Sequence, residues 1–388
     1  MTNRIPRDKE NDYTVEQAKQ RRDFAKEMTG VELNHVGQFS FDPAITAGNV
    51  ENFMGVAQVP IGLAGPLKVN GEHAQGDFYV PMATAEGTLV ASYSRGMRLL
   101  SESGGVTVSV VDDVMQRAPV FVFENARQAR DFGEWVDEHF DDIKAAAETT
   151  TRSGKLRNIE KYAAARMLYL RFNFTTGDAA GQNMVGKATY VACEWIMKNN
   201  STIKRYILSG SMDTDKKHSQ INTLHSRGKR VIAEATIPAE KLKSIMGVTP
   251  EQMYKHRAIS QVGSFMAGAV NTGAHSANGI TAVFMATGQD VANVAESSAA
   301  ITYADLTEDG DYYIAITIPS LICATFGGGT GLATQNECLQ LLDCVGKGKA
   351  RKLAEIIGGT VLAGELSLGS AVLAGDWVTS HDALGRNR

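Results

Sequence analysis

Long apolar runs, paired cysteines and proline are all scarce in this chain of 388 residues. No stretch approaches the ~18 consecutive apolar residues that a membrane-spanning helix needs, and the charged N-terminus has no apolar core typical of a secretory signal. The four cysteines form no C-x-x-C pair and have no histidine at metal-ligand spacing. We therefore expect small buried thiols in a reduced, cytoplasmic protein, without disulfides or structural zinc.

An excess of charge of one sign is also missing. The chain has 39 Lys plus Arg and 43 Asp plus Glu, a formal net charge of −4, which gives no general case for nucleic-acid or membrane-surface binding. Hydrophobic residues at 43% and charged residues at 21% are typical of a folded protein and exclude global disorder.

Glycine is the residue in surplus. The chain has 38 glycines but only nine prolines, so the glycines do not belong to a low-complexity Pro/Gly tract. They gather in short segments, where we expect the backbone to pass close to a ligand or to a helix. These segments are GVAQVPIGLAGPL, GDAAGQNMVG, FGGGTG and the run from GAVNTG to GQD.

The pattern of helices and strands indicates one large domain interrupted by a smaller one. Thr14 is a candidate cap, with Gln17 three residues on, for a helix over 15–28. Helical spacing of apolar residues continues from 125 to 148, and LYLRFNF (168–174) alternates like a half-buried strand. With a further helix over about 181–198, this region resembles a compact split-βαβ unit.

Two isolated carboxylates stand in segments without other charges. Glu86 lies among small and apolar residues, where burial would favour the protonated form and suit a proton donor. The alternative is a carboxylate at a solvated helix start. Asp290 lies in a long uncharged run, so it either meets a lysine, shares a proton in a site, or caps a helix after Gly288.

Lysines and a histidine mark two further candidate positions. Lys216 and Lys217 follow Asp213 and Asp215 in a loop, and a lysine held by carboxylates could stabilise an oxyanion. An exposed charge run that caps a helix is the alternative. His381 stands seven residues from the C-terminus, where it is either a proton shuttle near neutral pH or an ordinary exposed histidine.

Phosphate-binding signals are present but irregular. The absence of G-x-G-x-x-G and Walker A motifs excludes the standard Rossmann and P-loop assignments. GDAAGQNMVGK (177–187) joins a strand to a helix, whose free N–H groups could receive a phosphate. FGGGTG (326–331) would let the backbone approach a flat ligand closely, although a plain turn would use the same residues.

Taken in order, a series of motifs resembles the signatures of the 3-hydroxy-3-methylglutaryl-coenzyme A (HMG-CoA) reductases. The resemblance runs from about Glu51 to the C-terminus. The D-K-K loop and the histidine-bearing tail are more similar to the NADPH-using biosynthetic class than to the NADH-using degradative class. The motifs are ENFMGVAQVPIGLAGPL, PMATAEGTLVAS, TGDAAGQNMVGKAT, SGSMDTDKK, VGSFMAGAVNTGAHSAN, TGQD, FGGGTG, GTVLAGELSL and VTSHDALGRNR.

The resemblance implies an α+β fold with three parts. These are a helical N-terminal segment (1–50), a large substrate- and CoA-binding domain (51–109 with 208–388), and an inserted ferredoxin-like NADP(H)-binding domain (110–207). It also implies a homodimer or a dimer of dimers, with each active site at the subunit interface. We expect a cytoplasmic catalytic portion without a membrane anchor and without nucleic-acid partners.

The resemblance also assigns the catalytic roles in the reduction of HMG-CoA to mevalonate and CoA, which consumes two NADPH. Lys216 would stabilise the oxyanion, and Glu86 would supply a proton to the developing alcohol. Asp290 would bridge and tune these two groups, and His381 would protonate the departing thiolate from a flap that closes over the site. The alternatives left open are NAD-dependent mevalonate oxidation on the same scaffold and a non-catalytic CoA-thioester binding protein.

Binding residues follow from the same matching of motifs. Substrate contacts fall on Ser209, Asp215, Lys217, His275 and Asn278. CoA contacts fall on Ser92, Arg95 and Arg98. Cofactor contacts fall on Thr151 and Arg152 at the 2′-phosphate, and on Asp178, Ala180, Gly181, Asn183, Gly327 and Gly328.

The chain departs from the family pattern at several positions. Ser109 stands where relatives carry an arginine near the substrate carboxylate. Ile259 stands where a CoA-contacting lysine is expected, and His256 or Arg257 is a candidate substitute. The GRNR tail holds one extra residue and is followed by no serine, so the regulatory phosphorylation known in the animal enzymes would have no target.

Overall fold

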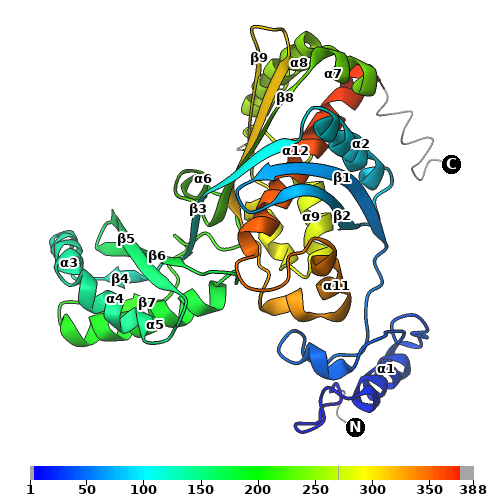
Figure 1. Cartoon of the computed structure of the whole chain (residues 1–388). Coiled ribbons are helices and arrows are strands. Elements are labelled where there is room, and N and C mark those ends of the chain that lie inside the picture. The colour runs from blue at the N-terminus through cyan, green and yellow to red at the C-terminus, as the bar shows by residue number, and fades with distance from the viewer. Residues whose placement is uncertain (1–3, 270, 376–388) are drawn as a thin grey trace.

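The computed structural model describes residues 4–269 and 271–375 of the chain. It is 43% helical and 22% strand, which confirms the predicted α+β class. Figure 1 shows a blue N-terminal segment, a large central body and a smaller green body to one side.

The N-terminal segment consists of α1 (Val15–Thr29), the short 3-10 helix η1 (Pro43–Thr46) and irregular chain. Thr14 caps α1 as predicted, because its side chain accepts a hydrogen bond from the Gln17 N–H, one of the helix-start donors that lack an intrahelical partner. The buried Arg21 donates to the Phe53 carbonyl at 3.0 Å, which ties α1 to the chain leading into the central body.

Six strands form the larger sheet. In order across the sheet they are β2 (Gln75–Ala83), β1 (Ile61–Gly71), β3 (Val106–Arg117), β8 (Gly228–Ile237), β10 (Tyr312–Leu321) and β9 (Ile301–Leu306). β1 and β3 are parallel, and the other neighbouring pairs are antiparallel. β3 pairs with β8 up to Val114, whereas its last three residues pair with a strand of the smaller sheet. One strand therefore belongs to both sheets.

The long helix α12 (Ala350–Ala374) is the core helix of the larger body (Figure 1). Gly358 and Gly359 let it lie against the sheet, since a Cβ on either would come within 3 Å of valines on β8 or β3. By length and composition α12 could cross a membrane, but 78% of its most apolar window is buried inside the protein. It also carries the buried carboxylates Glu355 and Glu365.

Shorter helices complete the larger body. At the crossing of α2 and α12 a Cβ on Gly96 would lie 1.9 Å from the Ala363 carbonyl oxygen, so only glycine permits this approach. The helices are α2 (Leu89–Glu102), α6 (Gln220–His225), α7 (Ala239–Met246), α8 (Pro250–Met266), α9 (Ser276–Thr287), α10 (Val294–Ser297) and α11 (Ala333–Leu341), with 3-10 turns η2 (Val291–Asn293) and η3 (Gly328–Gly331).

The smaller sheet is antiparallel and has its own hydrophobic core. Its strands are β4 (Val120–Val122), β5 (Lys155–Ala164), β6 (Met167–Thr175) and β7 (Arg205–Ile207), and its helices are α3 (Ala126–Glu138), α4 (Phe140–Glu148) and α5 (Gln182–Asn199). β6 pairs with β5, with β4 and with the end of β3, and β7 pairs with β4. The core includes Phe121, Phe132 and Phe172, each at most 2% exposed.

Two details differ from the sequence predictions. The helical spacing over 125–148 belongs to two helices, because the chain turns at His139, whose φ of −109° and ψ of 19° end α3. β6 is buried on both faces rather than on one, since Arg171 is 0% and Asn173 is 3% exposed. The polar face of β6 therefore lies against other polar groups of the protein instead of solvent.

Candidate active site

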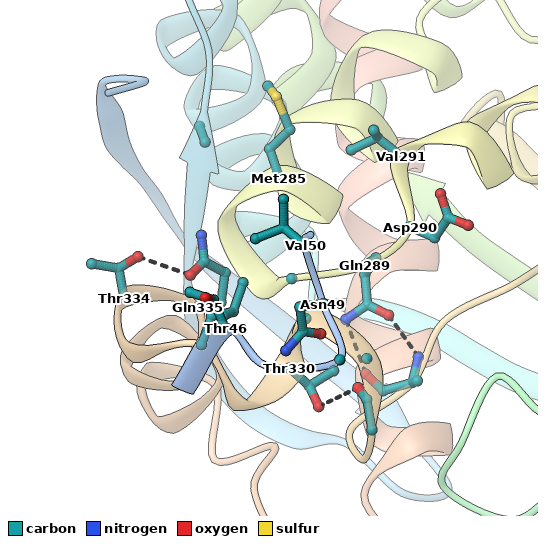
Figure 2. Close-up of a pocket in the computed structure, with 18 of the residues that line it drawn as sticks. Thr46, Asn49, Val50, Met285, Gln289, Asp290, Val291, Thr330, Thr334 and Gln335 are labelled. Carbon is teal, nitrogen blue, oxygen red and sulfur yellow. Dashed lines mark hydrogen bonds between the residues drawn. The ribbon is translucent and has the colours of Figure 1, made fainter. Parts of the chain in front are cut away.

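A cavity of about 1440 Å³ lies between the start of α5, the end of α9, the glycine-rich segment 326–331 and the N-terminal segment. Figure 2 shows Asn49 and Val50 of the N-terminal segment on its wall, together with Met285, Gln289 and Thr330. Small-molecule sites usually have ~300–1,000 Å³, so this cavity has room for an extended ligand.

Asp290 stands on the wall of this cavity and forms an ion pair with Lys216. The Lys216 Nζ lies 2.8 Å from Asp290 Oδ2, while Asp290 Oδ1 accepts the Ala292 N–H at 3.0 Å and caps η2. Two of the predicted alternatives for Asp290, a lysine partner and a helix cap, are therefore both correct. The hydrogen bond to Asp290 raises the pKa of Lys216, which keeps its ammonium protonated near neutral pH.

The loop that carries Lys216 is held from several sides. The Lys216 N–H donates to Glu296 Oε1 at 2.9 Å. Asp215 Oδ1 accepts from Arg227 Nη2 at 2.6 Å and from Gln182 Nε2 at 3.1 Å. Gln182 also lines the cavity, so the wall and the lysine loop share a side chain.

The other charges of this loop divide between the surface and the interior. Asp213 is 1% exposed and accepts from Arg117 Nη1 at 2.7 Å and from the Ser209 hydroxyl at 3.1 Å. Lys217 is exposed, and its Nζ donates to the Asp215 carbonyl at 2.9 Å. The predicted exposed charge run is therefore correct for the lysines but not for Asp213.

A second group of predicted residues surrounds Glu86, between β2 and α2. Glu86 Oε2 accepts from Asn278 Nδ2 at 2.8 Å. His275 stacks on Tyr93 with ring centroids 4.9 Å apart, and its carbonyl accepts from the Tyr93 hydroxyl at 2.6 Å. Burial lowers the pKa of His275, so the neutral imidazole prevails at pH 7. We call Glu86, His275 and Asn278 the Glu86 cluster.

Of the two alternatives for Glu86, a carboxylate at a solvated helix start is the correct one in the single chain. The prediction that Glu86 is buried among small and apolar residues is wrong. Glu86 is exposed, because the turn that carries it lies at the surface. Within the described residues no hydrogen bond or ion pair joins Glu86 or Asn278 to Lys216 or Asp290. The described part of one chain thus presents two clusters of candidate groups that no hydrogen bond or ion pair joins.

Most of the predicted cofactor residues gather at the cavity. Thr151 and the exposed Arg152 are not on its wall, but their turn packs against it, since a Cβ on Gly154 would come within 2.5 Å of the cavity residue Met184. The predicted cofactor residues that line the cavity are Ala180, Gly181, Asn183, Gly327 and Gly328.

The surroundings of Asp178 differ from those of the predicted cofactor residues that line the cavity. Its carboxylate accepts the Gly348 N–H at 2.8 Å and the Ala350 N–H at 3.1 Å, at the start of α12. Asp178 is not on the cavity wall within the described structure. Its side chain ties the start of α5 to the start of α12.

The predicted CoA residues lie along α2. The Ser92 and Ser367 hydroxyls are 3.0 Å apart, and Arg95 Nη2 donates to the Ser367 carbonyl at 2.8 Å. Arg98 is exposed and pairs with Glu102 at 2.7 Å. Arg98 therefore presents its guanidinium to solvent, whereas Arg95 is half-buried.

Positions that depart from the family pattern also have defined surroundings. The Ser109 hydroxyl donates to Glu72 at 3.3 Å, and Ile259 is 73% exposed. Arg257 donates to the Thr272 carbonyl at 3.1 Å and lies 3.6 Å from Glu365, so its guanidinium faces the interior. His381 lies outside the described residues.

Three residues at the site were not singled out from the sequence: Gln182, Arg227 and Glu296. Each acts through a partner that is distant in the sequence, and no local motif marks such a contact. The one available signal is the charge of Glu296 in a nearly uncharged run, six residues after Asp290.

Comparisons with known proteins agree with the motifs. The family model described as hydroxymethylglutaryl-coenzyme A reductase matches residues 17–386. The 3-hydroxy-3-methylglutaryl-coenzyme A reductase of Pyrococcus horikoshii is 44% identical over 374 residues, covering 94% of this chain and 91% of that protein. The enzyme of Methanothermobacter thermautotrophicus is 44% identical over 369 residues, with coverages of 94% and 92%.

A solved structure has the same fold. The class II 3-hydroxy-3-methylglutaryl-CoA reductase of Streptococcus pneumoniae, bound to NADPH in open conformations, has a TM-score of 0.69 at 20% identity, covering 90% of this chain and 92% of that chain. Because the family model and these close relatives span nearly the whole sequence, the chain belongs to the hydroxymethylglutaryl-coenzyme A reductases, a family of oxidoreductases.

Proposed function

We propose that this chain catalyses the NADPH-dependent, four-electron reduction of (S)-HMG-CoA to mevalonate and CoA, in the mevalonate pathway of isoprenoid biosynthesis. The observation that carries the proposal is the Lys216–Asp290 ion pair beside the large cavity. A cation at this position would neutralise the oxyanion that develops when a thioester or aldehyde carbonyl is reduced.

The cavity fits a dinucleotide. Helix α5 begins after Gly181, which has a φ of 84°, and no side chain caps its first N–H groups. Uncapped donors at a helix start suit a pyrophosphate, and Gly327 and Gly328, with φ of 80° and 56°, let the opposite wall approach closely. Bound NADPH would supply a hydride in each of the two reductions.

The chain's own groups would handle the charges and protons. Lys216 would stabilise the oxyanion of the hemithioacetal and then polarise the aldehyde, and Asp290 would keep Lys216 protonated. Glu86 would give a proton to the developing alkoxide. His381 would protonate the CoA thiolate so that it does not attack the aldehyde again.

Substrate and cofactor binding would be divided between the bodies. We assign residues 110–207 to a cofactor domain, with Thr151, Arg152, Asp178 and Asn183 near the dinucleotide. Ser209, Asp215, Lys217, His275 and Asn278 would hold the hydroxymethylglutaryl group. Ser92, Arg95 and Arg98 would serve CoA, where arginine suits phosphates.

We further propose a homodimer, or a dimer of dimers, whose active site combines the Glu86 cluster of one subunit with Lys216 and Asp290 of the other. Two observations support it. No hydrogen bond or ion pair joins the two clusters within the described chain, and the end of α8 exposes large apolar side chains, with Phe265 at 84% and Met266 at 81%. Monomeric proteins seldom leave such residues grouped in solvent.

Loss of NADPH absorbance in the presence of HMG-CoA tests the proposed reaction. Wild type should turn over, and Lys216→Ala should lose about 10²–10³-fold in kcat, the range for removing one oxyanion-stabilising group. Lys198→Ala, which removes an exposed lysine on α5, is the control and should keep its rate. No wild-type turnover, or full activity in Lys216→Ala, contradicts the proposal. A much higher kcat/KM with NADH contradicts the choice of NADPH.

A further inference from the structure

The loop around Lys216 has an unfavourable backbone conformation. Lys216 has a φ of +56°, and Ser211 and Thr214 of the same loop have φ of 69° and 51°; Ser226, at the end of α6, has a φ of 58°. Residues with a Cβ enter this left-handed region at a cost, so surrounding contacts must hold them there. Those contacts also determine the direction in which the Lys216 side chain leaves the backbone.

Glu296 provides the contact at Lys216 itself. Its Oε1 accepts the Lys216 N–H at 2.9 Å and lies 3.4 Å from Arg227 Nε. The Glu296 side chain is 0% exposed. A buried carboxylate thus binds the backbone of the residue whose ammonium pairs with Asp290.

Arg227 joins the two sides of this loop. Its side chain is 0% exposed, and it donates to Asp215 Oδ1 at 2.6 Å and to the Gln116 carbonyl at 3.1 Å. One planar guanidinium therefore contacts the residue before Lys216 and the carboxylate that holds the Lys216 N–H. Lysine could not make this set of contacts, because it lacks the rigid fork of donors.

Ser226, which follows α6 and precedes Arg227, is held by polar side chains of β6 and β3. The Ser226 carbonyl accepts from Arg171 Nη2 at 3.2 Å and from Gln116 Nε2 at 3.0 Å. The buried ion pair between Arg227 and Glu296 is expensive to desolvate, and such pairs add little net stability over apolar packing. The presence of this pair beside a strained loop therefore points to a role in geometry rather than in stability.

We infer that Glu296 and Arg227 are positioning residues, which hold the Lys216 backbone in its left-handed conformation and so fix the lysine ammonium against Asp290. This inference rests on the proposed function of Lys216. Neither side chain faces solvent, so each acts through the loop rather than on substrate.

Kinetics of Glu296→Ala and Glu296→Gln test the inference. The glutamine keeps an oxygen for the Lys216 N–H, whereas alanine has none. We expect Glu296→Ala to lower kcat about 10–100-fold, with little change in KM for NADPH, and Glu296→Gln to recover most of that loss. Arg227→Lys should also lower kcat. This variant provides the test of the inference if Glu296→Ala fails to fold. Equal losses in both Glu296 variants, or an unchanged kcat in Glu296→Ala, overturn the inference.

Glu355→Ala is the matched control. Glu355 is also a fully buried carboxylate that accepts backbone N–H groups, but at the turn between β1 and β2, from Glu72, His73 and Ala74. It should lower the unfolding temperature and leave the kcat of the folded enzyme unchanged. A proportional loss of kcat in this control would show that Glu296 acts on stability alone.

A second readout does not depend on turnover. Lysines reductively methylated with ¹³C can be titrated by NMR, with the Lys216 signal assigned by its loss in Lys216→Ala. Glu296→Gln removes the same negative charge, so release of the loop in Glu296→Ala should break the Asp290 pair and lower the pKa of Lys216 below its value in Glu296→Gln. Equal titrations of the two variants overturn the positioning role, even if the proposed reaction is correct. A lowered pKa in an enzyme without HMG-CoA turnover supports positioning and rejects the proposed reaction instead.

Discussion

At the scale of single residues, the two oxygens of Asp290 have separate partners. The Ala292 N–H holds one oxygen and thereby orients the other toward Lys216. Side-chain exposures of 45% for Asp290 and 43% for Lys216 leave both groups open to a ligand in the neighbouring cavity. Because the pair is fixed and still accessible, Lys216 can contact a reacting oxygen in place of Asp290 without any rearrangement of the backbone.

Asp290→Asn should move the alkaline limb of the pH–rate profile to lower pH. The hydrogen bond to Asp290 raises the pKa of Lys216, whereas burial lowers it. Removal of the carboxylate takes away the largest raising effect and leaves the smaller ones of Asp215 and Glu296, so Lys216 loses its proton at a lower pH and the rate declines earlier as pH rises. Measurement of kcat/KM from neutral to strongly alkaline pH checks this. An alkaline limb at the wild-type position would mean that Lys216 does not set it.

Residue chemistry was predictable where it depends on local sequence. The uncharged surroundings of Asp290 already required a partner, and a lysine and a cap were both among the predictions. The tertiary partners of Asp178 and Arg257 were not predictable. Asp178 bonds to N–H groups about 170 positions further along the chain, and Arg257 faces Thr272 and Glu365. Such pairings depend on how helices cross, which motif spacing does not encode.

At the scale of elements, the end of α9 explains one of the glycines near the cavity. Gly288 ends the helix with a φ of 72°, and a Cβ there would lie 2.2 Å from the Gly329 carbonyl oxygen. The helix end and the glycine-rich segment therefore touch backbone to backbone. Their contact forms part of the wall beside Asp290.

Gly288→Ala should destabilise the protein and raise the KM for NADPH. Gly247→Ala is the control, because Gly247 ends α7 at a similar φ of 73° with open space around its Cβ. The control should cost only the ~1–2 kcal/mol of a left-handed alanine, whereas Gly288→Ala adds the overpacking cost, typically ~1–3 kcal/mol. Urea unfolding measures both variants. Equal losses of unfolding free energy in the two variants would show that the cavity wall accommodates the added methyl group of Gly288→Ala at no extra cost.

Elements with strong periodicity or capping signals were predicted well. Thr14 and Gln17 begin α1 as expected, and the strand over 168–174 lies within β6. The break at His139 was missed because apolar spacing continues through it. The burial of Arg171 was missed because its polar partners, Asn222 and Ser226, come from another part of the chain.

At the scale of the whole molecule, the proposed dimer makes a quantitative prediction. Glu86→Gln and Lys216→Ala should each be inactive alone. In a mixed dimer one site combines the intact Glu86 of one chain with the intact Lys216 of the other, while the second site carries both changes. Random exchange makes half of the dimers mixed, so about a quarter of all sites should be active.

Activity measured after the two variants are mixed and allowed to exchange subunits checks this expectation. Recovery should be absent when either variant is mixed with itself. It should also be absent when Lys216→Ala is mixed with Asp290→Ala, because both groups would come from the same subunit. Recovery in that last mixture, or none in the first, would contradict a site shared in the proposed way.

The strand common to both sheets has a consequence for how the molecule is assembled. β3 leaves the larger sheet beside β8, with Val114 opposite Gly228, so the chain over 115–227 begins and ends at the two sides of one rung of an antiparallel ladder. This insert, which contains the smaller body, the Lys216 loop and α6, therefore occupies the place of a hairpin turn. Chain inserted at a hairpin tip leaves the register of both strands unchanged, and loop-closure entropy grows only slowly with its length. The larger sheet can thus accommodate inserts of different size at this point, provided that their two ends meet at the spacing of neighbouring strands.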